Sequence, residues 1–85
     1  MKSFKYVITD PVGIHARPAQ TLVADAKKYA SKITIECNGK SAGATSLIKL
    51  MSLGIKKDDE ITVTVEGDDE EAAAVSFEEF LKANL

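Results

Sequence analysis

The sequence predicts an α/β (α+β) fold, an open-faced β-sandwich in which a four-stranded antiparallel sheet carries three helices on one face. Segments with an apolar residue at every second position alternate with segments whose apolar residues recur every three or four positions. These two periods are typical of strands and helices respectively. The resulting order, β-α-β-β-α-β-α, resembles the split βαβ plan, in which two units interleave their strands into one sheet. We expect residues 1–85 to form a single domain.

The strands are predicted from their alternation. Three segments alternate, and their apolar positions are Phe4, Tyr6, Ile8, Ile33, Ile35, Cys37, Ile61, Val63 and Val65. Asn38-Gly39 predicts a two-residue hairpin turn, because both central residues of such a turn need a positive φ. Residues 40–43 then form a short return strand, and their small side chains indicate an edge. Because the strands alternate, one sheet face should carry the helices and the other should face solvent.

Three helices are expected in the rest of the chain. The first has Pro18 in its first turn, where a missing N–H costs little, and its apolar stripe comprises Ala19, Leu22, Val23, Ala26 and Ala30. The second is short, with Ser46 as the expected N-cap and Gly54 as a left-handed stop. The third follows Gly67, and its inward residues should include Ala73, Phe77, Phe80 and Leu81.

Composition excludes several classes of function. A net charge of −2 with 28% charged and 45% hydrophobic residues is ordinary for a globular domain and implies no face for nucleic acid. The sequence has no membrane-length apolar run and no N-terminal signal segment, so a cytoplasmic protein is expected. The lone Cys37 excludes an internal disulfide and is expected to be a small buried hydrophobe. Without a metal-ligand set or a glycine-rich nucleotide loop, no metal or other cofactor is expected.

The segment from Gly13 to Ala19, GIHARPA, carries the strongest functional signal. It holds the only histidine, His15, just before the expected helix start, where free N–H groups and the helix dipole attract anions. From position alone a surface or capping role for His15 is the commoner interpretation, but Gly13, Arg17 and Pro18 favour a preorganised anion site. The dipole and Arg17 both disfavour the imidazolium, so His15 should be a neutral nucleophile. No acid is placed to activate water, which favours a phosphoryl relay over hydrolysis.

The short second helix has two features that a purely structural role does not require. Ser46 suffices as a cap, yet a phosphate would also be tolerated at this helix start. The apolar residues crowded into this helix exceed one narrow stripe, and they include Leu47, Ile48, Met51 and Leu53. Ile48 and Met51, with Lys49 between them, therefore indicate an exposed docking patch rimmed by charge.

These residues together resemble the HPr family, the histidine phosphocarriers of the bacterial sugar phosphotransferase system. The resemblance spans essentially the whole chain and its element order. It rests on the GIHARPA segment at 13–19 and on Asn38-Gly39-Lys40, Ser46-Leu47 and Met51-Ser52-Leu53-Gly54.

The resemblance implies a carrier rather than an enzyme, working as a monomer. Enzyme I, charged by phosphoenolpyruvate, would transfer a phosphoryl group to Nδ1 of His15, and the carrier would deliver it to the A-domains of sugar-specific enzymes II. Arg17 would help to hold the group. The two partners would dock in turn on a surface that includes Ala16, Gln20, Leu47, Ile48, Lys49 and Met51.

Ser46 matches the serine that an HPr kinase/phosphorylase modifies in many Gram-positive relatives, where a catabolite-control regulator is a further partner. Lys49 is similar to enteric relatives, whereas Met51 agrees with the Gram-positive form, so regulation at Ser46 stays open. A regulatory binding module controlled at Ser46 and a phosphocarrier paralogue of a nitrogen branch are the alternatives. A small-molecule-binding regulator is least favoured, because so short a chain can hardly enclose a pocket.

Overall fold

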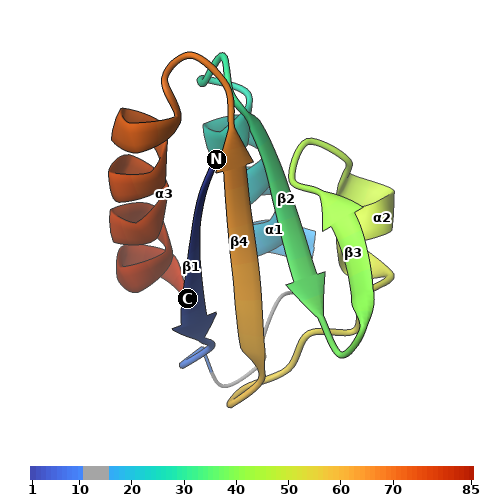
Figure 1. Cartoon of the computed structure of the whole chain (residues 1–85). Helices are drawn as coiled ribbons and strands as arrows, with labels where there is room; N and C mark the ends of the chain where they lie inside the picture. Colours follow the sequence, from blue (N-terminus) through green and yellow to red (C-terminus); the bar gives the residue numbers. More distant parts are fainter. Residues whose placement is uncertain (11–15) are drawn as a thin grey trace.

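The computed structural model of the chain describes residues 1–10 and 16–85. This part of the chain forms four strands and three helices, and the predicted order β-α-β-β-α-β-α is confirmed. The strands make one fully antiparallel sheet in the order β1-β4-β2-β3, so β1 and β3 are its edges (Figure 1). The elements are β1 (Lys2–Val7), α1 (Ala16–Ala26), β2 (Lys32–Cys37), β3 (Lys40–Gly43), α2 (Leu47–Met51), β4 (Glu60–Glu66) and α3 (Glu70–Asn84).

The two faces of the sheet differ because the strand register aligns like residues across it. Val63 on β4 pairs with Phe4 on one side and with Ile35 on the other, so a row of apolar side chains crosses the sheet. At the alternate positions polar residues meet, as where Thr64 pairs with Thr34. The apolar face packs against the helices, and the polar face lies open to solvent, as the alternation predicted.

The helices share one core with the inner face of the sheet. Helix α1 contacts both α2 and α3, and α3 also packs on β1 and β4. The predicted inward residues of α3 are confirmed: Ala73, Phe77 and Leu81 are fully buried, and Phe80 is partly buried against the same cluster. Cys37 is buried in this core, also as predicted. None of the helices described is long and apolar enough to cross a membrane.

Both turn predictions that depend on a positive φ are confirmed. Asn38 and Gly39 have φ values of 54° and 80°, as a two-residue hairpin of this kind requires. Gly54 has a φ of 66°, and it follows the end of α2 closely. A side chain at either glycine position would therefore strain the backbone.

One helix prediction was wrong, and another is confirmed only in part. After Ala26 the chain leaves the helix in turns, in which the Lys28 and Tyr29 N–H groups donate to carbonyls three residues back. Ala30 therefore lies outside α1 and is exposed, and its N–H donates to the Asp69 carboxylate at 3.0 Å. Ser46 occupies the N-cap position of α2, but its side chain makes no capping hydrogen bond. The main chain of Ser46 is bonded instead, since its carbonyl accepts from the Leu50 N–H at 2.9 Å.

Candidate functional site

Helix α1 starts where the sequence predicted the site. Its first residue is Ala16, which directly follows the expected phosphoryl acceptor, His15. His15 itself lies outside the described residues. Gln20, predicted to contact partners, is exposed on this helix, whereas Ala19 beside it is buried in the core. Helix α1 therefore buries one face and keeps its first turns accessible from the other.

The first turn of α1 carries positive charge that no acid on the turn offsets. Residues 16–19 include Arg17 and no carboxylate, and the Arg17 side chain is exposed. The Thr21 hydroxyl donates to the Arg17 carbonyl at 3.2 Å, so this hydrogen bond involves the main chain of Arg17 and not its guanidinium group. The positive end of the helix dipole and the exposed Arg17 guanidinium together make this end of α1 suited to an anion.

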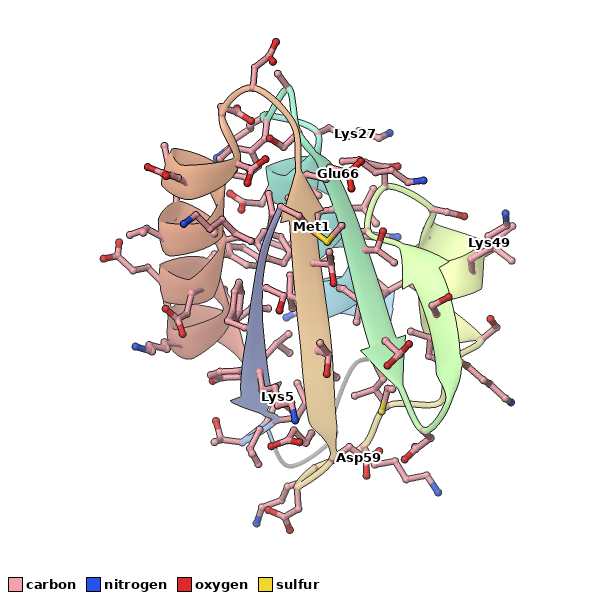
Figure 2. The ribbon with its side chains drawn as sticks, in the orientation of Figure 1. Met1, Lys5, Lys27, Lys49, Asp59 and Glu66 are labelled. Carbon is pink, nitrogen blue, oxygen red and sulfur yellow. The ribbon has the colours of Figure 1, made fainter. Side chains whose placement is uncertain are left out.

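Helix α2 displays apolar side chains on the surface, as predicted. Ile48 is 83% exposed and Met51 is 42% exposed. Between them Lys49 points away from the sheet, as Figure 2 shows. The opposite side of this short helix is anchored by Leu50, which is fully buried, and Leu47 is partly buried against the core. Because α2 packs against α1, the exposed side chains and the start of α1 belong to neighbouring helices.

Sequence reasoning missed an anchor at the end of β1, just before the site. The main-chain oxygen of Leu85 accepts a hydrogen bond from the Thr9 N–H at 2.6 Å, from the Asp10 N–H at 2.8 Å and from the Thr9 hydroxyl at 2.7 Å. On the other side, the Ile8 N–H donates to the Asp59 carbonyl at 3.0 Å. No sequence pattern marks Leu85 for this role, because the accepting atom belongs to the main chain.

A second cluster of hydrogen bonds lies at the other end of the molecule and involves Asp69. Its carboxylate accepts from the Ser31 hydroxyl, from the Ala30 N–H at 3.0 Å and from the Ser31 N–H at 2.9 Å. The Ser31 hydroxyl and then the Ala30 N–H hold the pKa of this carboxyl below its ordinary value. The cluster joins the connection after α1 to the start of α3, and its role is structural.

The other titratable groups give no second site. Glu70 pairs with the amino group of Met1, and this contact, followed by the Gly67 N–H, lowers the pKa of Glu70. Burial, and then the charge of Asp59, raises the pKa of the Cys37 thiol, which disfavours the reactive thiolate. Within residues 1–10 and 16–85, no group of three or more potential metal ligands comes together.

The chain matches a family model described as "PTS HPr component phosphorylation site" over residues 2–83. It is 45% identical over 85 residues to the phosphocarrier protein HPr of Mycoplasma genitalium, covering 99% of this chain and 97% of that protein. It is 49% identical over 74 residues to the HPr of Buchnera aphidicola subsp. Baizongia pistaciae, covering 87% of each.

The fold is similar to that of a solved relative as well. The crystal structure of an HPr from Thermoanaerobacter tengcongensis superposes with a TM-score of 0.93 at 34% identity, covering 99% of this chain and 94% of that one. The family model, the relatives and the fold therefore all agree with the resemblance that the sequence motifs indicated. The chain belongs to the HPr family: it is a phosphocarrier of the phosphotransferase system in sugar uptake, working with other components of that system, and it is not an enzyme.

Proposed function

We propose that His15 is the residue that carries the phosphoryl group. The observation that supports this most is that α1 begins at Ala16, one residue after His15, with the exposed Arg17 and no acid in its first turn. In the transfer, the lone pair of imidazole Nδ1 forms the N–P bond while the bond between phosphorus and the donor breaks, and the donor keeps that electron pair. The Arg17 guanidinium and the free N–H groups of α1 then stabilise the charge of the phosphoryl oxygens.

The donor in this proposal is enzyme I, and the acceptors are the A-domains of enzymes II. Both dock in turn, in the cytoplasm, on one surface of a monomeric, single-domain carrier. The exposure of Ile48 and Met51 beside Lys49 supports α2 as the apolar part of that surface. Shared use requires modest affinity and fast exchange, for which a small apolar patch with steering charges is suited. The remaining residues of the surface are Ala16, Arg17, Gln20 and Leu47.

The test is phosphorylation by enzyme I and phosphoenolpyruvate, followed by the acid lability of the adduct. Wild type should take up label, and His15→Ala should take up none while keeping its melting temperature. Arg17→Ala should label at least about 10-fold more slowly, because a hydrogen bond to a charged group contributes about 1.5–3 kcal/mol. If His15→Ala labels as fully as wild type, the phosphoryl group is carried elsewhere. Comparing enzymes I of the sugar and nitrogen branches shows which branch charges the protein faster.

A second role, regulation at Ser46, is supported by a separate observation. Ser46 is half-buried at the start of α2 and makes no capping hydrogen bond through its side chain, so helix capping does not occupy its hydroxyl. A phosphate there adds a charge of about −1.5 to −2 directly beside the docking patch. Kinase assays with an HPr kinase/phosphorylase test this site, with Ser46→Ala as the control. A Ser46→Asp variant that binds a catabolite-control regulator no better than wild type would rule out this role.

A further inference from the structure

The chain has two methionines and one cysteine, and the structure places their sulfur atoms in three different settings. Met51 is the last residue of α2 and is 42% exposed. Met1, directly before β1, is 72% exposed. Cys37 is only 2% exposed, because it lies in the core. An oxidant in solution therefore reaches both thioethers, whereas the packing shields the thiol.

The two accessible methionines lie in different parts of the molecule. Met1 precedes the edge strand β1, while α2 packs against the opposite edge strand, β3, and against α1. Figure 2 shows Met1 well apart from Lys49 of α2. On α2, Met51 follows Ile48 by three residues, so the two exposed side chains are neighbours on the helix surface. A chemical change at Met51 therefore alters the docking patch, and the same change at Met1 does not.

We propose that Met51 is an oxidation site, at which a hydroperoxide converts the thioether to the sulfoxide and so weakens docking on α2. The inference rests on the proposed docking of enzyme I and of the A-domains on this helix. With hydrogen peroxide, a lone pair of the Met51 sulfur forms the S–O bond while the O–O bond breaks. The transferred oxygen gives its proton to the departing hydroxide, which leaves as water. Sulfur is thus oxidised and the peroxide is reduced.

The sulfoxide changes the patch in the direction that disfavours docking. Met51 supplies a flexible, apolar and polarisable side chain, of the kind that adapts to more than one partner surface. The sulfoxide is polar, so its burial at an interface carries a desolvation cost that the thioether does not have. Methionine sulfoxide reductases reverse the change, which makes it suitable as a redox-sensitive control of the relay.

The fold should tolerate oxidation at this position. Helix α2 is anchored by Leu50, which is fully buried, and by Leu47, which packs partly against the core. The remaining sulfur should stay reduced. Burial, and then the charge of Asp59, raises the pKa of the Cys37 thiol, which disfavours the thiolate that peroxide oxidises.

The experiment treats the full chain with hydrogen peroxide and locates the added oxygen by mass spectrometry of its peptides. The equilibrium affinity for enzyme I and the KM for transfer from phosphorylated enzyme I are then measured. Met1 and Met51 should each gain one oxygen, and Cys37 none. Oxidation should raise Kd and KM about 3- to 10-fold, as for loss of a moderate contact in an interface, while the maximal rate and the melting temperature stay close to those of the untreated protein. Sulfoxide reductases should restore the affinity.

Met51→Leu is the matched control, because leucine keeps the apolar volume without an oxidisable sulfur. This variant should bind enzyme I like wild type both before and after peroxide, although its Met1 is still oxidised. Met51→Gln places a polar side chain of similar length on α2 and should raise KM without any peroxide. If Met51→Gln fails to fold, the response of wild type and of Met51→Leu to peroxide decides by itself.

The proposal is overturned if Met51 gains no oxygen under conditions that oxidise Met1, or if protein oxidised at Met51 binds enzyme I as tightly as untreated protein. An equal loss of affinity in peroxide-treated Met51→Leu would also overturn it, because the cause would then lie elsewhere. The affinity measurement does not require a phosphoryl acceptor, so His15→Ala should respond to peroxide as wild type does. Labelling of His15→Ala would contradict the proposed acceptor and would leave this comparison intact.

Discussion

The two ends of the sheet are held by different kinds of hydrogen bond. At one end, near the C-terminus, residues 8–10, which follow β1, donate to main-chain oxygens of Leu85 and Asp59. At the other end, the oxygens belong to the side chain of Asp69, which holds Ser31. Figure 1 shows the C-terminus and the connection that leads into α3 at opposite ends of the molecule, and in Figure 2 Asp59 and Glu66 mark the two ends of β4.

This difference predicts how the two ends respond to substitution and to pH. The Asp59 carbonyl accepts its hydrogen bond from the Ile8 N–H whatever the side chain and at any pH in the working range. A carboxylate makes stronger, charge-assisted bonds, but only while it is ionised. The Asp69 end is also closely packed, because Gly67 approaches Ser31 there. We therefore expect changes at that end to affect folding and to leave transfer unchanged.

The largest expected effect comes from Gly67→Ala. Gly67 has a φ of +155°, and a Cβ on it would lie 2.6 Å from the Ser31 Cα, a main-chain atom that cannot move away easily. Overpacking and the strained backbone together should lower the free energy of unfolding by about 2–4 kcal/mol. Urea denaturation followed by circular dichroism measures this loss.

Gly43→Ala is the matched control for that substitution. A Cβ at Gly43 would meet no atom within 4 Å, so its unfolding free energy should change by less than about 0.5 kcal/mol. Under conditions in which both variants are folded, each should accept phosphoryl groups from enzyme I at the wild-type rate. Slow transfer by folded Gly67→Ala would contradict the separation between the two ends.

Local patterns predicted most of the fold because the relevant information lies within a few residues. Alternation placed Ile33, Ile35 and Cys37 in the core, and all three are buried. The turn at Asn38-Gly39 was predictable because only these two adjacent residues need a positive φ. The exposed patch on α2 was also predictable, since its apolar residues outnumber what one face of a short helix can bury.

Contacts between distant parts of the chain could not be predicted in this way. Ala30 lies outside α1, and its N–H is bonded to a carboxylate 39 residues away, at Asp69. The Thr9 hydroxyl donates to the main-chain oxygen of Leu85, which lies 76 residues away in the sequence, and every residue type has such an oxygen. Neither partner carries a local signal. The position of Ser46 was predicted correctly, but its side chain makes no capping hydrogen bond.

A smaller effect should distinguish the two helices that display apolar side chains. Ile48 on α2 is 83% exposed, and Val75 on α3 is 61% exposed. Ile48→Ser should raise the KM for transfer from enzyme I about 5-fold, because burying part of a large apolar side chain at an interface contributes about 1 kcal/mol. Val75→Ser should leave KM unchanged. Equal effects of the two substitutions would show that docking does not centre on α2.

The smallest effect should be the pH dependence that Asp69 confers. The folded protein holds the pKa of Asp69 below its ordinary value of 3.8, so the folded state binds this proton less tightly than the unfolded state does. The stabilisation is therefore complete above about pH 4 and is lost as the pH falls through the lowered pKa. Asp69→Asn should melt below wild type at neutral pH, and the gap should narrow on acidification.

Melting temperatures from about pH 7 down to about pH 3 measure this dependence. Asp68→Asn, which removes the exposed neighbouring carboxylate, controls for the change in net charge. Glu70 has a lowered pKa of the same sign, but it is present in every variant and cancels from the comparison. A gap between wild type and Asp69→Asn that stays constant with pH would mean that the shape of the side chain, and not its charge, holds this end.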